Sequence, residues 1–323
     1  MRLRADSVRV RVPATSANLG PGFDAMGVAL GLHDELLIRA VASPGVRVEV
    51  EGEGAGQVPD DERHLVVRAV RIALDHVGAP QAGLELMCRN AIPHGRGLGS
   101  SAAAVVAGLA AARGLISEPE ALDDATLLAL ATQLEGHPDN AAPAIVGGAT
   151  IAWSRPEAGG EGAVGCARIA VHDDVVPVVM VPPHHLSTKA ARGVLPEHVP
   201  HADAAAQAGR AALLVEALGR RPDLLLDATV DRLHQDYRRS VMPDSLALVD
   251  VLRRNGVAAV VSGAGPTVLA LARRTSAPGQ AVTTDADQAI ADAFGGVLGG
   301  WTIRPLPVDA TGVQVRTGDD PIG

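Results

Sequence analysis

The most constraining feature of this sequence is a glycine-rich segment that leads directly into an alanine-rich one, over residues 93–113. Glycines 95, 97 and 99 alternate with other residues, and a pair of serines follows at positions 100 and 101. Glycine adopts positive φ without steric cost, so such a turn can bring bare backbone close to a ligand. The alanines that follow favour a helix, which we expect Gly114 to end.

A glycine loop that enters a helix is typical of phosphate-binding sites. The first N–H groups of a helix have no partner within it, and the helix dipole adds partial positive charge at the same place. The segment is not a Walker A loop, because Gly-Lys-Ser/Thr is missing. A plain strand–turn–helix connection is the alternative. The combination of a proline, three alternating glycines and a serine pair at a helix start favours phosphate.

Composition narrows the class of protein further. A chain of 323 residues with 47% hydrophobic and 20% charged residues predicts a globular protein of two domains or one large one. A net charge of −9 argues against a dedicated nucleic-acid binder. Two cysteines, Cys88 and Cys166, make no disulfide framework and favour a reducing compartment. With no signal peptide and no long apolar run, we expect a cytoplasmic protein that does not enter a membrane.

Hydrophobic periodicity predicts a mixture of helices and strands without a regular βαβ repeat, and therefore an α+β fold. Strands are predicted at 8–12 (ended by Pro13), 29–41, 46–51, 84–88, 145–153, 175–181, 258–261, 268–272, 302–307 and 313–316. Helices are predicted at 62–77, 123–135, 202–218, 222–228, 245–254 and 286–294. Gly, Pro and Glu dominate residues 154–165, so we place a boundary there between domains 1–160 and 161–323.

Three segments resemble the signature motifs of the GHMP small-molecule kinases, in the order found in that family. Residues 93–103 resemble the second motif, Pro-x-x-x-Gly-Leu-Gly-Ser-Ser-Ala, which holds ATP phosphates. Residues 12–30 resemble the first motif in its homoserine kinase form, and residues 260–270, Val-Val-Ser-Gly-Ala-Gly-Pro-Thr-Val-Leu-Ala, resemble the third. The resemblance covers roughly residues 8–306.

The resemblance implies a kinase that transfers the γ-phosphoryl group of ATP to L-homoserine and gives O-phospho-L-homoserine, on the route to threonine. It implies a ribosomal-S5-like N-terminal domain, a ferredoxin-like C-terminal domain and ATP bound between them. It also suggests a homodimer. Glycines of the third motif would let its backbone approach the phosphate loop.

The resemblance also assigns the nucleotide and metal ligands. The ATP phosphates would be held by Pro93, His94, Gly95, Arg96, Gly97, Leu98, Gly99, Ser100, Ser101, Ala102 and Ala103. Mg²⁺ would be held by Glu135 and Ser101, with Ser100 as a further candidate. Physical chemistry agrees, because Glu135 is predicted at a helix C-terminus, where the dipole disfavours a carboxylate unless a cation is bound. Mg²⁺ takes one or two carboxylates together with phosphate oxygens.

The substrate residues follow in the same way. By resemblance the substrate is bound by Asn18, Asp24, His137, Asn140, Thr188, Arg192 and Arg238. Asp24 would receive its ammonium group, while Arg192 and Arg238 would hold its carboxylate. Asn18 and Asn140 would reach the hydroxyl and take part in catalysis. Asp139 stands where some relatives place a catalytic carboxylate, so it is a candidate base only.

Two alternatives and one departure stay open at this point. The substrate could belong to another GHMP kinase, such as a mevalonate-type enzyme, although mevalonate has no amine to pair with Asp24. The chain could also be a non-catalytic ligand-binding relative. His64 stands where relatives often carry Asn near the adenine, which puts that contact in doubt. Histidines 184, 185, 198 and 201 lack the spacing of a zinc site.

Overall fold

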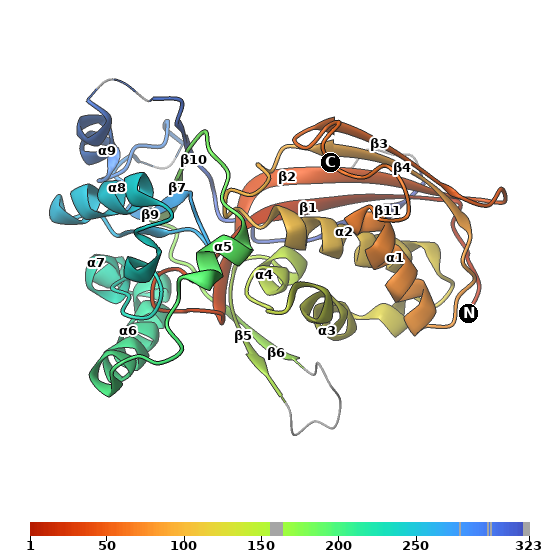
Figure 1. The fold of residues 1–323 in the computed structure, drawn as a ribbon, viewed down its shortest axis with the longest axis horizontal. Coiled ribbons are helices and arrows are strands. Elements are labelled where there is room, and N and C mark those ends of the chain that lie inside the picture. The colour runs from red at the N-terminus through yellow and green to blue at the C-terminus, as the bar shows by residue number, and fades with distance from the viewer. Residues whose placement is uncertain (156–163, 278, 296, 298, 319–323) are drawn as a thin grey trace.

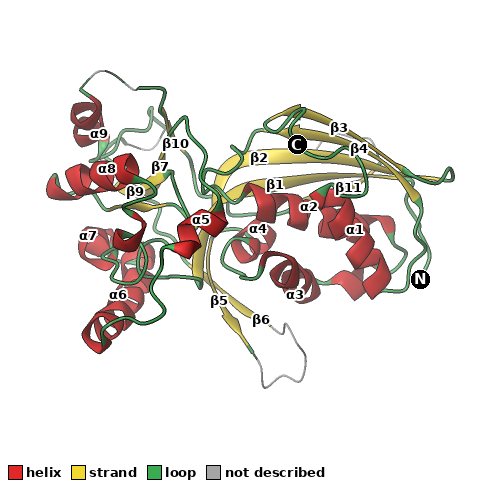
Figure 2. Ribbon diagram, in the orientation of Figure 1, coloured by secondary structure: helices red, strands yellow, loops and turns green. Residues whose placement is uncertain are grey.

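A computed structural model describes residues 1–155, 164–277, 279–295, 297 and 299–318. These residues form two β-sheets, each covered by helices, side by side along the long axis of the molecule (Figure 1). Helices and strands alternate irregularly along the chain, as Figure 2 shows. The predicted α+β class is therefore confirmed.

The first sheet has seven strands among the described residues. Its main path runs β11-β1-β2-β4-β3, and β5 pairs with both β2 and β6. The strands are β1 (Ser7–Ala17), β2 (Met26–Val41), β3 (Val46–Gly52), β4 (Gly83–Asn90), β5 (Ala149–Ser154), β6 (Val164–Ile169) and β11 (Gln314–Thr317). Four helices lie on one face of this sheet (Figure 1): α1 (Leu65–His76), α2 (Ser100–Leu115), α3 (Asp124–Glu135) and α4 (Ala141–Val146).

The second sheet has four antiparallel strands in the order β10-β7-β9-β8. They are β7 (Val175–Val181), β8 (Ala259–Val261), β9 (Val268–Arg273) and β10 (Thr302–Pro305). Its helices are α5 (Thr188–Gly193), α6 (His201–Gly219), α7 (Leu225–Ala228), α8 (Pro243–Arg254) and α9 (Asp287–Phe294). Every residue of β7 is buried, because alternate side chains enter two different core clusters. This explains an apolar run without polar alternation.

Helix α2 is the central helix of the first domain, buried on nearly all sides. Its small side chains allow close neighbours: a Cβ at Gly108 would lie 2.5 Å from the backbone oxygen of Val66 in α1. The sequence predicted that Gly114 would end this helix, and that expectation was wrong. Gly114 lies inside α2, where a Cβ would meet side chains of Val8 and Val315 at 2.8 and 2.9 Å. This glycine therefore serves packing against β1 and β11.

Two further sequence expectations about local structure were wrong. Pro13 does not end β1; the strand continues to Ala17 through a register shift between Pro13 and Ala14, and a bulge is a place where a strand tolerates proline. Residues 141–146 form α4 and not the start of a strand. The edge strand predicted at 313–316 is confirmed: β11 pairs with β1 at the edge of the first sheet.

The proposed domain boundary at residue 160 lies outside the described residues. Strand β6 follows it in sequence but pairs with β5 of the first sheet, as β11 pairs with β1. The sheet that begins with β1 is thus built from both ends of the chain. Within the described chain, no helix has the length and apolar character needed to span a lipid bilayer.

Candidate active site

A cavity of about 320 Å³ lies where the three motif segments meet. It contains most of the residues that the sequence singled out, although they come from distant parts of the chain. Its lining includes Asn18, Gly95, Gly97, Gly99, Ser100, Ser101, Ala102, Glu135, His137, Asp139, Asn140, Thr188, Arg192, Arg238 and Gly263.

The glycine loop presents bare backbone to this cavity. Gly95, Gly97 and Gly99 have φ of 62°, 75° and 69°, in the left-handed region that other residues avoid. Between Gly95 and Ala102, no backbone N–H donates a hydrogen bond to the described part of the chain. Their donors are therefore available to an anion, and the N-terminus of α2 adds its dipole.

The carbonyl groups of the same loop are, in contrast, engaged by the surrounding protein. The oxygen of Leu98 accepts from the N–H of Thr15 at 3.1 Å, and that of Gly95 accepts from Leu186 at 3.0 Å. The Gly97 oxygen accepts from the hydroxyl of Ser262 at 2.6 Å. Because the acceptors are tied to flanking elements, the peptide planes hold their donors toward the cavity. This loop therefore has the geometry of a preformed anion-binding nest, and we call it the nest below.

The third motif packs against the second, as the resemblance implied. A Cβ at Gly97 would lie 2.3 Å from the backbone oxygen of Ser262 and 2.8 Å from that of Gly265. A Cβ at Gly99 would lie 1.9 Å from the hydroxyl oxygen of Thr15. No side chain fits at either position without moving backbone or a buried hydroxyl, so both glycines are needed for close approach.

The hydroxyl of Ser101 donates to Oε1 of Glu135 at 2.7 Å. The first residue pair of α2 and the last residue of α3 thereby meet at the rim of the nest. A hydroxyl beside a carboxylate, next to a phosphate-binding loop, fits the oxygen ligands that Mg²⁺ prefers. Among the described residues no three His, Cys, Asp or Glu side chains are grouped as a metal cluster. The fit thus depends on phosphate oxygens completing the coordination.

Asp24 and Arg192 form a two-pronged ion pair, although the sequence assigned them to opposite ends of a substrate. Nη2 of Arg192 lies 2.6 Å from Oδ1 of Asp24, and Nη1 lies 3.1 Å from Oδ2. Each side chain is 36% exposed. The hydrogen-bonded carboxylate raises the pKa of Arg192 above its usual value. Arg192 lines the cavity, whereas Asp24 is not part of its lining and is connected to it through this ion pair.

Arg238 is a buried guanidinium, only 1% exposed. Its Nε donates to the backbone oxygen of Ala191 at 3.1 Å, and its Nη1 contacts Nδ1 of His234 at 2.9 Å. Within the described residues no carboxylate pairs with it directly. Burial, together with the positive charge of Arg192, lowers the pKa of Arg238 to about 10. A buried cation without an ion pair favours an anionic ligand.

The loop of the first motif is strained and closely bonded. Asn18, Leu19 and Asp24 all have positive φ, at 71°, 49° and 55°. The side chain of Asn18 donates to the oxygen of Gly263 at 2.8 Å and accepts from the N–H of Asp24 at 3.0 Å. Asn18 thus joins the first motif to the third and orients Asp24. Strain of this kind is concentrated at functional sites.

Residues 137–140 follow α3 and line the cavity floor. Nδ1 of His137 lies 2.9 Å from Oδ1 of Asp139, and this contact raises the pKa of His137. Asn140 donates to the same oxygen at 3.3 Å and accepts from the hydroxyl of Thr15 at 2.8 Å. Asp139 is 2% exposed. Its partners fix the carboxylate in one orientation beside the cavity.

A second, more apolar cavity of about 290 Å³ adjoins the nest and shares Ser100 and Ser101 with it. Val12, Leu36, Leu65, Val66 and Ala107 form much of its wall. His64 also lines it, and Nδ1 of this histidine is buried without a hydrogen-bond partner. Burial and the nearby His94 lower the pKa of His64. The wall of this cavity is thus mostly apolar, and His64 adds one ring nitrogen that is buried without a hydrogen-bond partner.

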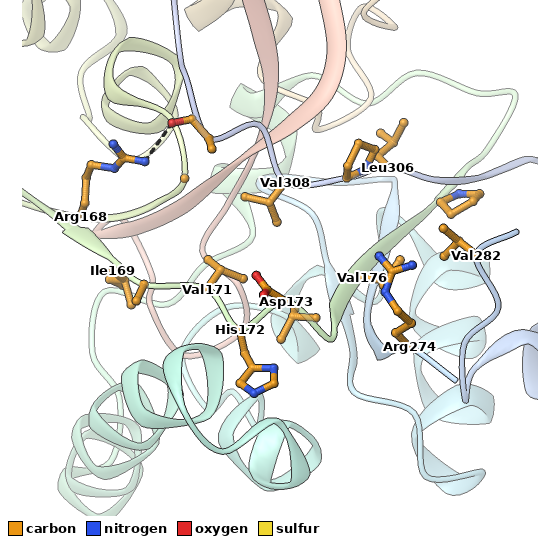
Figure 3. A pocket seen from close by; sticks show the side chains of 16 residues that line it. Arg168, Ile169, Val171, His172, Asp173, Val176, Arg274, Val282, Leu306 and Val308 are labelled. Atoms are coloured by element: carbon orange, nitrogen blue, oxygen red, sulfur yellow. Dashed lines mark hydrogen bonds between the residues drawn. The ribbon is translucent and has the colours of Figure 1, made fainter. Parts of the chain in front are cut away.

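A larger cavity, of about 650 Å³, lies elsewhere (Figure 3). It is lined by the two chain crossings between the sheets, at residues 170–173 and 305–308, and by Arg168, whose guanidinium donates to the oxygen of Ala310 at 2.9 Å. None of the residues predicted for the site lies in it. Volume alone therefore does not mark the catalytic centre.

Five of the predicted nucleotide ligands do not line the site cavity: Pro93, His94, Arg96, Leu98 and Ala103. The side chain of Arg96 donates to the oxygens of Pro182 and Pro183 at 3.0 and 2.8 Å, so it links the loop to the second sheet. Leu98 is buried in the core. Pro93 lines a different cavity. Nδ1 of His185 contacts the oxygen of His94 at 2.8 Å, which gives this histidine a structural partner.

The sequence reasoning missed His234 and Phe23. Both are next to the charged groups: Phe23 stacks on His234 with ring centroids 4.9 Å apart, and the guanidinium carbons of Arg192 and Arg238 lie 5.7 and 5.8 Å from the Phe23 ring. The spacing of four between His234 and Arg238 was the available signal, because residues at that spacing share one face of a helical turn.

Comparisons with known proteins agree with this geometry. Residues 64–148 match the family described as GHMP kinases N terminal domain, and residues 204–284 match GHMP kinases C terminal. The homoserine kinase of Streptomyces avermitilis is 54% identical over 314 residues, which are 97% of this chain and 96% of that protein. That of Streptomyces coelicolor is 55% identical over 313 residues, 97% of this chain and 95% of that protein.

Solved structures show the same fold. A crystal structure of homoserine kinase from Cytophaga hutchinsonii superimposes with a TM-score of 0.79 at 27% identity, covering 96% of this chain and 98% of that one. Mevalonate kinase from L. major gives 0.63 at 18% identity, covering 94% and 95% of the two chains, which supports the fold alone. With motifs, cavity geometry and long, closely similar relatives in agreement, this chain belongs to the homoserine kinase family of the GHMP kinases.

Proposed function

We propose that this chain transfers the γ-phosphoryl group of ATP to the side-chain hydroxyl of L-homoserine, giving O-phospho-L-homoserine and ADP. The anion-binding nest between Gly95 and Ala102 would hold the triphosphate through backbone donors. The adjoining apolar cavity, which contains His64, is the natural place for the adenine. Reaction products of this kind belong to a route toward threonine, as the resemblance implies.

Ser101 and Glu135 would hold Mg²⁺. When bound, this ion would neutralise charge on the phosphate oxygens. The ligand set has one carboxylate and one hydroxyl, so affinity for the metal should be low until ATP supplies further oxygens.

The single observation that carries the substrate assignment is the grouping of Asp24, Arg192 and Arg238 beside the nest. An amino acid brings one ammonium and one carboxylate, and this group offers one acid and two guanidiniums. The substrate would insert its ammonium next to Asp24 and its carboxylate between the two arginines. Thr188 lines the same cavity and could donate to the carboxylate.

The hydroxyl would be oriented by Asn140, and Asn18 would support it from the first motif. Asp139 is the candidate acceptor for the proton that leaves the hydroxyl. A loose transition state asks little of a base, so positioning and charge stabilisation can carry most of the acceleration. In that case Asp139 serves chiefly to hold His137 and Asn140 in place.

The decisive experiment is ADP release measured with homoserine, mevalonate and shikimate, for wild type and Arg192→Ala. We expect turnover with homoserine and a loss of apparent homoserine affinity of about 2–4 kcal/mol in the variant, with the KM for ATP little changed. Arg239→Ala is the control, since Arg239 is exposed and pairs with Asp236 and Asp250. Preference for mevalonate would favour the mevalonate-type alternative. Homoserine binding without turnover would favour a non-catalytic relative.

The compartment and the oligomeric state of the enzyme are also proposed here. We infer a cytoplasmic homodimer that uses no nucleic acid and no membrane. Sedimentation of the purified protein at several concentrations tests the dimer; a monomer at every concentration would exclude it.

A further inference from the structure

We infer that His234 is a positioning residue which directs one nitrogen of Arg238 into the substrate cavity. This inference depends on the proposed function, because it concerns recognition of the substrate carboxylate. It begins with the three nitrogens of Arg238. Nε is used by the oxygen of Ala191, and Nη1 by His234 and by the oxygen of Gly263 at 3.2 Å. Within the described residues, Nη2 alone makes no hydrogen bond, and Arg238 lines the cavity.

The contact between the two side chains fixes the protonation of His234. Arginine offers donors only, so Nδ1 of His234 must accept from Nη1 at 2.9 Å. The ring proton therefore lies on Nε2, which donates to the backbone oxygen of Gly20 at 2.8 Å. Burial lowers the pKa of His234 and keeps the ring neutral. A neutral ring next to a buried cation avoids repulsion between two charges.

His234 is itself held from several sides. It is fully buried, and Phe23 stacks on its ring. The carboxylate of Asp231 accepts from the backbone N–H groups of Leu233, His234 and Gln235, and Oδ1 of Asp231 lies 3.5 Å from Nε2 of His234. The turn that carries the ring is thus fixed before any ligand binds. A small rotation of the ring would move Nη1 and, with the planar guanidinium, Nη2.

The side chain of His234 joins two parts of the site. Through Gly20 it contacts the loop of the first motif, which carries Asp24, and through Arg238 it contacts the group assigned to the carboxylate. One imidazole therefore fixes the position of Arg238, the predicted carboxylate partner, relative to the loop that carries Asp24, the predicted ammonium partner. A buried histidine with a purely structural role would not be expected to affect one end of the substrate selectively.

Two matched variants test this role. His234→Gln keeps a donor near the position of Nε2, toward Gly20, and removes the acceptor for Arg238. His234→Asn keeps an acceptor near the position of Nδ1 and loses the contact with Gly20. We expect His234→Gln to raise the KM for homoserine about 10-fold to 100-fold with the KM for ATP unchanged, and His234→Asn to raise it by less. Thermal unfolding of both variants reports the structural cost separately.

A truncated substrate isolates the carboxylate. 3-Aminopropan-1-ol has the amine and hydroxyl of homoserine but no carboxylate, so His234→Gln should phosphorylate it at the wild-type kcat/KM. Selective loss with homoserine and none with the amino alcohol supports the inference. Equal loss with both alcohols, a parallel rise in the KM for ATP, or a larger rise in the KM for homoserine in His234→Asn than in His234→Gln overturns it.

Should the Gln variant fail to fold, near-wild-type homoserine kinetics in a folded His234→Asn would support the role, and a raised KM for both substrates would refute it. Absence of wild-type turnover with homoserine would instead reject the proposed function.

Discussion

Arg192, which lines the substrate cavity, forms an ion pair with Asp24, and their closest atoms are 2.6 Å apart. Asp24 belongs to the first motif and Arg192 to α5, and the two are assigned to different ends of the expected substrate. Since both groups are partly exposed, their pairing contributes at most about 1 kcal/mol to stability. When a zwitterion binds, its ammonium can replace Arg192 as the partner of Asp24, and its carboxylate can replace Asp24 as the partner of Arg192. The ion pair thus keeps both groups oriented while no ligand is bound.

This exchange predicts the behaviour of Asp24→Asn. We expect the free energy of unfolding to fall by less than about 1 kcal/mol, whereas homoserine affinity falls by about 2 kcal/mol or more, because the substrate ammonium loses its charged partner. Urea unfolding and calorimetric titration with homoserine measure the two effects. A large loss of stability with unchanged affinity would mean that Asp24 serves the fold.

Gly97→Ala should damage ATP binding through sterics. The added Cβ would meet two backbone oxygens of the third motif, at 2.3 and 2.8 Å, and neither can move without opening the nest. Gly78→Ala is the matched control: Gly78 has φ of 62°, yet its Cβ would meet nothing within 4 Å. We expect the control to lose about 1 kcal/mol of stability and keep its kinetics. Similar ATP KM values for the two variants would contradict the role of the nest.

Glu135→Gln should weaken the binding of magnesium. The amide keeps a group that can bond to Ser101 but removes the charge, so we expect kcat to fall about 100-fold to 1000-fold and the Mg²⁺ concentration for half-maximal rate to rise. Ser101→Ala should act in the same direction but less strongly. Initial rates across a magnesium titration measure both. An unchanged magnesium dependence in Glu135→Gln would exclude it as a ligand.

His64→Leu tests the adenine cavity. If Nδ1 of His64 bonds to the base, the variant should show a KM for ATP raised about 10-fold, with the KM for homoserine unchanged. Kinetics with ATP and GTP show whether discrimination between the bases also falls. A more stable variant with wild-type kinetics would mean that the nitrogen is merely buried, because removal of an unsatisfied polar group stabilises the core.

Asp34 predicts how stability depends on pH. Burial raises the pKa of this carboxyl from 3.8 to about 6. Between these values the folded chain binds more protons than the unfolded chain, so stability falls as pH rises through this window, and the cost is complete above pH 6. Asp34→Asn keeps an oxygen for the N–H groups of Ala91 and Ile92 and removes the charge. It should stabilise the protein at pH 8 by at most about 3 kcal/mol. Urea unfolding from pH 4 to 8 measures this; a variant that is less stable at pH 8 would contradict it.

The sequence allowed much of the catalytic centre to be predicted because local backbone chemistry determines it. Three glycines that must adopt positive φ, and a serine pair at a helix start, indicate an anion site without knowledge of distant residues. Helix caps are equally local: the side chain of Asp123 accepts from the N–H of Thr126 and that of Ser187 from the N–H of Ala190, and both are residue types that favour the N-cap position.

Long-range relationships could not be predicted in this way. Nothing local to Asp24 or Arg192 reveals that they pair, and His234 gains its meaning only from Gly20, far away in sequence. Strand β11 shows the same limit, because its alternating pattern predicts an edge strand but not which sheet it joins. The predicted role of each substrate residue stays a prediction.

Strand β11 has a consequence for how the protein is made. Strand β11 pairs with β1 at the edge of the first sheet. The first sheet therefore cannot be completed until the ribosome has synthesised the whole second sheet and then β11. The edge of β1 is uncovered in the meantime, and uncovered edges recruit other chains. Nascent chains stalled before residue 314 should therefore depend on chaperones more strongly than full-length ones.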